Sequence, residues 1–166
     1  MAAEEGILIV QIDTDLPLAS VDLGSGRVAT NLPAGQHLWM IPAKAGRDEW
    51  ARFVVSVGGG ATHSVSMSEV NVRFDDEFEF DVEAGAVNYP GELIIRSDGW
   101  SGSSPDVVVR NRNHSAMAVR RLRERHGAEL DRLPLRYGGR SQDGFLSYYT
   151  RVRDQVAAGT VEGASE

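Results

Sequence analysis

The sequence lacks several features that would assign it to a familiar class. Its 166 residues include no cysteine, which excludes a disulfide framework, thiolate catalysis and a zinc–thiolate site, and leaves the redox compartment open. No apolar run approaches the ~20 residues that a membrane-spanning helix needs. The longest such run, Ile7–Val10, is typical of a buried strand.

Motifs for catalysis and for metal binding are also missing. The segment Gly99–Ser103 matches a G-x-S-x-G nucleophile elbow only in part, because its last position is serine and it lies between predicted strands. No glycine group precedes a Lys-Ser or Lys-Thr pair, so a phosphate loop is excluded. Neither H-x-H nor H-E-x-x-H spacing occurs among the four histidines, which are His37, His63, His114 and His126. We therefore predict a non-enzymatic protein with no cofactor and no metal.

An enzyme with a dispersed polar site is the alternative to that prediction. Such a site would use His63, Asp75 or Asp76. It requires these side chains to meet in one concave pocket in the folded chain.

The segment Phe78–Arg96 contains the clearest structural pattern. Alternation predicts a strand with Phe78, Phe80 and Val82 on a buried face and with acidic residues on the other. A turn at Ala84-Gly85 follows, and then a second strand that Pro90-Gly91 interrupts. We interpret the segment as an antiparallel hairpin with one face in the core and one face in water.

Short strands with turn signals between them occupy most of the remaining chain. The predicted strands are Ile7–Ile12, Leu18–Leu23, Arg27–Thr30, His37–Ile41, Trp50–Val57, Val65–Phe74 with a bulge near Ser68-Glu69, and Pro105–Arg110. Strands at this spacing favour a sandwich or a barrel over a βαβ fold.

The apolar period changes to that of a helix after Asn113. We expect Ser115 to cap a first helix, which Pro134 would end, and a second helix over Asp143–Ala157. Its apolar face would consist of Phe145, Tyr148, Tyr149, Val152 and Val156. The predicted fold is thus mainly β: an antiparallel β-sandwich of seven to nine strands over residues 6–112, and a helical extension of one or two α-helices over 113–158, packed on the sandwich. A disordered tail is expected over 159–166.

Charge is divided unevenly along the chain. Residues 110–140 hold nine arginines against three acidic residues, a net charge of +6. Because the whole chain has a net charge of −7, the rest of the chain carries −13. We predict that the arginine-rich helix after Asn113 (the basic helix) docks on the predicted strand that carries Glu79, Asp81 and Glu83 (the acidic strand). Arg120, Arg121 and Arg123 would then face Glu79 and Asp81. Nucleic acid is not an expected partner of such an acidic chain, and anionic lipid is a lesser option. The alternating carboxylates of the acidic strand do not converge as calcium ligands must.

Trp100 is the best candidate for a binding residue. It lies in the small-residue loop Ser97–Ser104, where nothing nearby in the sequence would bury it, whereas Trp39 and Trp50 lie within strands and are assigned to the core. Loop tips on a rigid scaffold often carry binding residues. We hypothesise a ligand site at Trp100, Asp98 and Tyr89, in which the indole stacks on a sugar or inserts into a partner. The alternative is that Trp100 folds back and caps the core.

Three segments resemble a known pattern: Leu32–Leu38, Phe80–Gly85 and Val87–Leu93. Together they are similar to bacterial envelope β-sandwich domains of unknown function, in which l-P-x-G-x-h precedes one strand and f-x-v-x-x-G-x-x-x-Y-x-G-x-l forms a later hairpin. The resemblance covers roughly residues 7–110. It implies a prealbumin-like, carboxypeptidase-regulatory-like or immunoglobulin-like sandwich and no activity, and it supplies no catalytic residues. We separately hypothesise an interaction domain whose partner is a protein or a glycan.

The same resemblance implies a location. Many of these domains are small lipoproteins or secreted proteins, but this chain lacks a lipobox cysteine, so membrane association would require an upstream signal or lipobox. The start, MAAEEG, has neither a basic n-region nor an apolar h-region. We expect a periplasmic or secreted protein whose signal peptide Met1 replaces, with a cytoplasmic location as the alternative.

Overall fold

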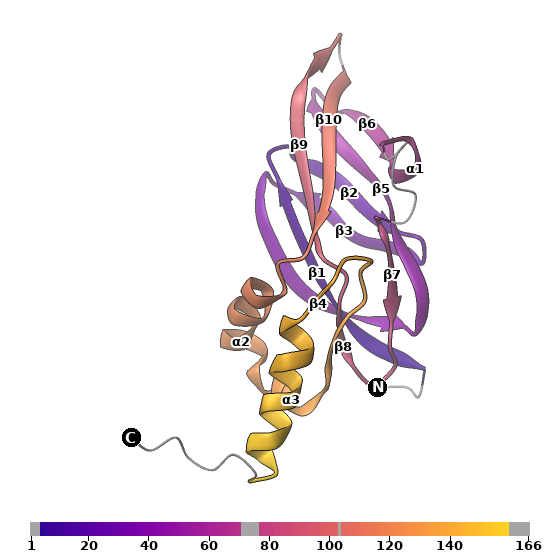
Figure 1. Cartoon of the computed structure of the whole chain (residues 1–166). Coiled ribbons are helices and arrows are strands. Elements are labelled where there is room, and N and C mark those ends of the chain that lie inside the picture. The colour runs from indigo at the N-terminus through magenta and orange to yellow at the C-terminus, as the bar shows by residue number, and fades with distance from the viewer. Residues whose placement is uncertain (1–3, 71–76, 103, 160–166) are drawn as a thin grey trace.

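Two packed β-sheets with two helices at one end make up the fold in the computed structural model, which describes residues 4–70, 77–102 and 104–159 (Figure 1). The strands are β1 (Glu5–Thr14), β2 (Leu18–Leu23), β3 (Gly26–Leu32), β4 (Gly35–Lys44), β5 (Gly46–Gly58), β6 (Ala61–Ser66), β7 (Glu79–Val82), β8 (Val87–Tyr89), β9 (Glu92–Ser101), β10 (Ser104–Arg112) and β11 (Leu135–Tyr137). The helices are α1 (Met67–Val70), α2 (Ser115–Arg132) and α3 (Phe145–Ala157). The predicted sandwich with C-terminal helices is confirmed, with eleven strands in the described residues instead of seven to nine.

The six-stranded sheet is built around β1. Strand β4 pairs antiparallel with the whole of β1 on one side. On the other side, β8 and β9 both run parallel to β1, β8 beside Ile7 and Leu8 and β9 beside Gln11–Thr14. Strand β10 extends the sheet beyond β9 and β11 extends it beyond β8. This sheet is therefore mixed, whereas the five-stranded sheet is antiparallel.

The five-stranded sheet has the order β3-β2-β5-β6, with β7 on the N-terminal part of β5. The pairing of β7 with β5 contradicts the predicted hairpin, because β7 and the strands after it belong to different sheets. The buried side chain of Asn88 holds the crossover: it accepts from the Glu83 N–H (2.9 Å) and donates to the carbonyls of Glu83 (3.0 Å) and Ala86 (3.2 Å). Alternation correctly identified the buried face of β7, but it does not specify which strand is the partner.

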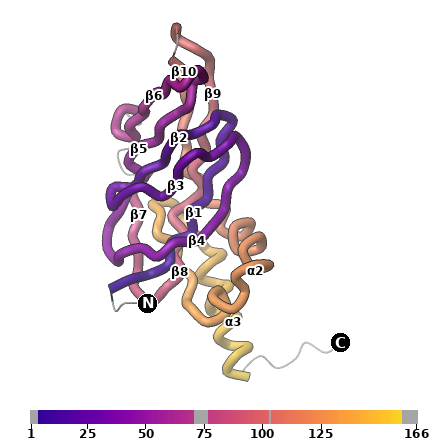
Figure 2. Tube along the Cα trace, turned by 180° about the vertical axis from the view of Figure 1, so that it is seen from behind, coloured from indigo at the N-terminus to yellow at the C-terminus, as the bar shows by residue number. Residues whose placement is uncertain are grey.

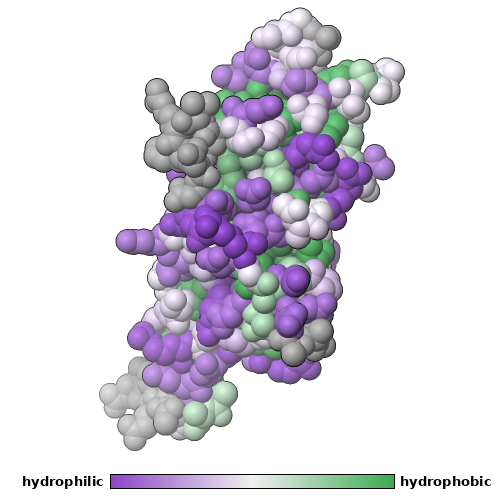
Figure 3. Space-filling view, turned by 90° about the vertical axis from the view of Figure 1, so that its right-hand side faces the viewer, coloured by the Kyte–Doolittle hydropathy of each residue, from purple (hydrophilic) through white to green (hydrophobic). Residues whose placement is uncertain are grey.

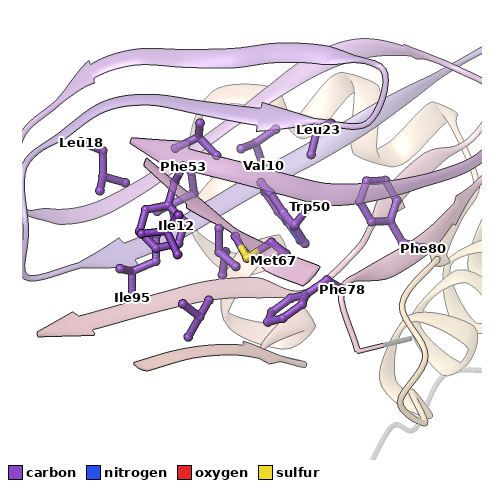
Figure 4. Packing of buried hydrophobic residues seen from close by; sticks show 14 of the residues in the cluster. Val10, Ile12, Leu18, Leu23, Trp50, Phe53, Met67, Phe78, Phe80 and Ile95 are labelled. Carbon is purple, nitrogen blue, oxygen red and sulfur yellow. The ribbon is translucent and has the colours of Figure 1, made fainter. Parts of the chain in front are cut away.

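The main hydrophobic core lies between the two sheets (Figure 4). Phe53, Trp50 and Phe80 come from the five-stranded sheet, and Val10, Ile12 and Ile95 come from the six-stranded one. The rings of Trp50 and Phe80 lie 6.2 Å apart. Burial of this apolar surface is the principal force that holds the sheets together.

A second core lies between the outer face of the six-stranded sheet and the helices. Ile9, Val87 and Tyr89 face Leu122 and Leu130 of α2, with Leu146 of α3. Strand β1 is consequently buried on both faces, as its continuous apolar run predicted. The chain after Asn113 also supplies β11, so residues 113–158 share a sheet and a core with the sandwich.

Two local predictions were wrong. The strand expected over Val65–Phe74 ends at Ser66, and Met67 starts a single helical turn that inserts its side chain into the core; residues 71–76 lie outside the described residues. Ser115 does not cap α2 with its side chain; its N–H donates to the Asn113 side chain (3.0 Å). The predicted tail lies outside the described residues from residue 160 onward. Within the described ranges, no helix is long and apolar enough to span a membrane.

Candidate functional site

The three predicted ligand-binding residues do not share one surface. Trp100 is 55% exposed and lies near the end of β9, in the β9–β10 hairpin that projects from the sandwich at the end opposite to α2 and α3 (Figure 1). Asp98 lies in the same hairpin. Tyr89 is fully buried in β8, where its hydroxyl donates to Gln11 (2.9 Å). A site at the hairpin can therefore include Trp100 and Asp98 but not Tyr89.

The hairpin is more regular than the sequence predicted. Strand β9 continues to Ser101 and β10 begins at Ser104, so most of the expected loop is strand. The register shifts between Asp106 and Val107, which pair with Gly99 and Ser97 and leave Asp98 as the extra residue of a bulge. Trp100 is thus held on a strand as an exposed side chain and does not cap the core.

The predicted helix–sandwich ion pairs also have other partners. Glu79 pairs with Arg47, and Arg140 lies 2.8 Å from Asp81. On α2, Arg123 pairs instead with Asp131 (2.8 Å). The acidic strand does receive an arginine from the C-terminal extension, but from the segment after β11 and not from the helix.

Glu83, the residue after β7, pairs with Arg136 of β11 (2.9 Å), so its partner also comes from the C-terminal extension and not from α2. Hydrophilic residues cover the middle of the face that includes β7 (Figure 3). The α2 arginines Arg120 and Arg121 are exposed, so their charge is available to a partner or a ligand.

A groove of about 500 Å³ opens where β3, β4 and α2 meet. Strands β3 and β4 are the edge strands of the two sheets, so the sandwich is open along this side, and α2 lies beside β4 (Figure 2). Its apolar part includes Val28, Leu32 and the half-buried Trp39. Trp39 also packs against the inter-sheet core, which fixes the position of its indole.

The polar part of the groove comes from α2 and from the start of β4. Arg121 and Arg125 are four residues apart and so project from the same side of the helix. Arg121 donates to the side-chain oxygen of Gln36 (3.3 Å), and His37 bonds the Pro33 carbonyl through Nε2 (2.8 Å). The groove therefore combines a fixed aromatic ring, two guanidinium groups and an amide. Such a set can hold a small anionic ligand that contains a ring.

The assignment of Trp39 to the core is confirmed, since it packs on the inter-sheet core, but the groove that Trp39 also lines was not predicted. Alternation along β4 indicates only which residues share a face: Leu38 and Met40 face the helices, whereas Trp39 and Ile41 face the inter-sheet core. The i, i+4 spacing of Arg121 and Arg125 was visible in the sequence. Their position beside β4 depends on how α2 packs, which no local pattern specifies.

A buried polar network lies between the sheet and the start of α2. Gln11 donates to Glu92 (2.8 Å), whose other oxygen bonds His114 Nδ1, and the Tyr89 hydroxyl accepts from the His114 N–H (3.2 Å). Gln11 and Glu92 are almost fully buried. Burial raises the pKa of Tyr89 well above its usual range. The network connects β1, β8 and β9 to α2, and its hydrogen bonds are internal, as a structural network requires.

The alternative enzyme site stays a prediction, because only one of its three residues lies in the described part of the chain. His63 lies on β6, and Asp75 and Asp76 lie outside the described residues. Within the described residues, no group of three or more histidine, aspartate or glutamate side chains is placed to hold a metal ion.

No family model, no curated protein and no solved structure matches the chain.

Proposed function

We propose that the chain is a non-enzymatic binding domain that holds an acidic saccharide in the groove between β3, β4 and α2. The observation that carries this proposal is the groove itself, which Trp39 at the edge of β4 lines together with Arg121 and Arg125 of α2. The apolar faces of sugar rings pack on indole rings. Guanidinium groups form paired, charge-assisted hydrogen bonds with carboxylates.

Charge supports a small anion over a long one. The described residues that line the groove include Arg121 and Arg125 and no carboxylate. The chain outside residues 110–140 carries −13, which repels a long polyanion such as a nucleic acid but acts less on a short charged oligosaccharide. A volume of about 500 Å³ suits a few sugar rings.

The test is titration with an oligomer of galacturonic acid, its neutral galactose counterpart and an oligothymidylate. We expect saturable binding of the acidic saccharide alone. The double variant Arg121→Gln/Arg125→Gln should weaken that binding by about tenfold or more, since it removes two charge-assisted contacts. Arg120→Gln/Arg132→Gln removes the same charge from α2 positions that do not line the groove, and should leave the affinity within about twofold.

Trp39→Ala is a second variant, and a melting curve must accompany it because Trp39 packs on the core. Equal binding of the neutral saccharide, preference for the oligothymidylate or insensitivity to the groove variants would each overturn the proposal.

A second candidate function is carbohydrate binding by the β9–β10 hairpin. The favouring observation is that Trp100 is 55% exposed on a projecting strand pair. Under this alternative, Trp100→Ala abolishes saccharide binding and the groove variants do not. Two expectations from the sequence stay predictions: that the chain belongs to the bacterial envelope, which an export assay would test, and that it lacks catalytic activity, which a hydrolase screen would test.

A further inference from the structure

Helix α3 presents an apolar stripe to solvent. The sequence predicted that Phe145, Tyr148, Tyr149, Val152 and Val156 form the apolar face of this helix, in an extension packed on the sandwich. The structure instead buries Leu146 and Thr150, and leaves Tyr148 57% and Val156 61% exposed. The helix is therefore apolar on two sides, only one of which has a partner in the described chain.

Polar contacts fix α3 in this rotation. Arg153 donates to the carbonyls of Leu130 (2.8 Å) and Leu133 (2.6 Å) at the C-terminal end of α2. The Thr150 hydroxyl and the backbone of Leu135 in β11 exchange two hydrogen bonds of 3.4 Å. These contacts hold the inward side of the helix against α2 and β11, so turning the stripe inward would break them.

The stripe forms a hollow with a basic rim. A depression of about 300 Å³ lies against Phe145, Tyr148, Val152 and Val156. The Arg123 guanidinium, which lines the hollow, lies 5.6 Å from the Tyr149 ring centroid, and the Arg151 guanidinium, which does not line it, lies 5.5 Å from that of Tyr148. Asp131 and Asp154 pair with Arg123 and Arg153 and do not line the hollow.

We propose that this stripe binds an amphipathic helix with acidic flanks from a partner protein. An apolar helix face of this length is a common docking element for another amphipathic helix. A second copy of the chain is disfavoured as the occupant, because two α3 stripes packed together would bring arginine rims against each other. A partner with glutamates or aspartates beside its apolar residues meets both the stripe and the rim.

The experiment is selection from a displayed library of random 16-residue peptides on the full chain, with counter-selection on Val152→Glu. We expect the recovered peptides to carry apolar residues at i, i+3 or i+4, and i+7, with acidic residues beside them. The affinity of a selected peptide, measured by fluorescence anisotropy, should fall about tenfold in Val152→Glu, which corresponds to the loss of one buried apolar contact. Ser147→Glu adds the same charge at an exposed α3 position that does not line the hollow, and should bind normally.

Two further measurements complete the test. Replacing the acidic residues of the peptide by glutamine should weaken binding about tenfold, and Tyr148→Ala should reproduce the loss in a variant that adds no charge. Peptides that lack acidic residues, or that bind Val152→Glu equally well, would overturn the proposal. So would self-association that Val152→Glu abolishes in sedimentation, or preferential binding of the chain to phosphatidylglycerol vesicles through the stripe.

Discussion

The two outer faces of the sandwich differ in whether their polar groups are bonded internally or solvated. The outer face of the six-stranded sheet is covered by α2 and α3 and buries Gln11, Tyr89 and Glu92 in a closed hydrogen-bond network. The five-stranded sheet has no such cover in the described chain, and its outer face carries Asp22 between Arg27 and Arg52. A covered face must satisfy its polar groups internally, because water cannot reach them. An uncovered face can leave the heads of its arginines in water.

Loss of apolar packing on the covered face should have the largest effect. Leu130→Ala removes a fully buried side chain from the core between the sheet and the helices. We expect the free energy of unfolding to fall by about 3 kcal/mol, through lost transfer energy and the cavity that remains. Urea denaturation measures this change. Arg52→Ala on the uncovered face is the comparison and should cost less than about 1 kcal/mol; equal costs would erase the distinction between the faces.

Removal of one member of the buried network should rank second. Glu92→Leu deletes both carboxyl oxygens and leaves the buried side-chain amide of Gln11 without its acceptor, whereas the ring of His114 is 42% exposed and can bond water. A stranded buried polar group of this kind costs about 1–3 kcal/mol. In a double-mutant cycle with Gln11→Leu, the two substitutions should couple by about 1 kcal/mol, because each removes the partner of the other. Additive costs would mean that the two groups act independently.

The contrast between the faces explains which parts of the fold the sequence predicted. Strand β1 is apolar at consecutive positions because both of its faces are buried, and that pattern identified a central strand. Strand β2 was predicted at its observed bounds, since turns flank it on both sides. Strand β11 was missed because three residues, Leu135–Tyr137, give no periodicity. The hairpin over Phe78–Arg96 was wrong because alternation assigns faces and not partners.

The candidate sites show the same limit. For Trp100 the sequence left two possibilities open, an exposed binding residue or a cap on the core, and in the structure its side chain is 55% exposed. The groove could not be predicted, because Trp39, Arg121 and Arg125 meet only through the packing of α2 on β4. The stripe on α3 was recognised as apolar, but its outward rotation depends on Arg153 and Thr150, which bond the neighbouring backbone.

The free energy of unfolding at alkaline pH should depend on Tyr89, a residue of the covered face. Burial raises the pKa of Tyr89, so the folded protein keeps this phenol protonated where the unfolded chain ionises it. The resulting stability is fully present below pH about 10 and is lost as the pH rises above that value. Tyr89→Phe should cost about 1 kcal/mol at pH 7, through its two lost hydrogen bonds. It should also reduce the decline in unfolding free energy between pH 9 and 11.

Tyr137 has a raised pKa for the same reason, burial, so Tyr89→Phe should reduce this decline and not remove it. We expect the ionisation of Tyr89, monitored by ultraviolet absorbance, to occur at the same pH as unfolding. A phenol that titrates freely in the folded protein would contradict its place in the closed network.

The smallest effect is expected on the uncovered face, at acidic pH. The hydrogen bond from Arg27, with that from Arg52, lowers the pKa of Asp22 although burial acts in the opposite direction. Because the folded pKa is lowered, this stability is present above pH about 4 and is lost as the pH falls through the folded value. Both arginines are about half exposed, so solvent screens the pairs and their contribution stays below about 1 kcal/mol. Asp22→Asn should flatten the acid limb of the stability profile, and added salt should do the same to the unmodified protein. The Asp22 side chain is itself only 10% exposed, so the screening acts through the two arginines. An acid limb that salt leaves unchanged would mean that the pairs are shielded from solvent as the network of the covered face is, and the two faces would then be stabilised alike.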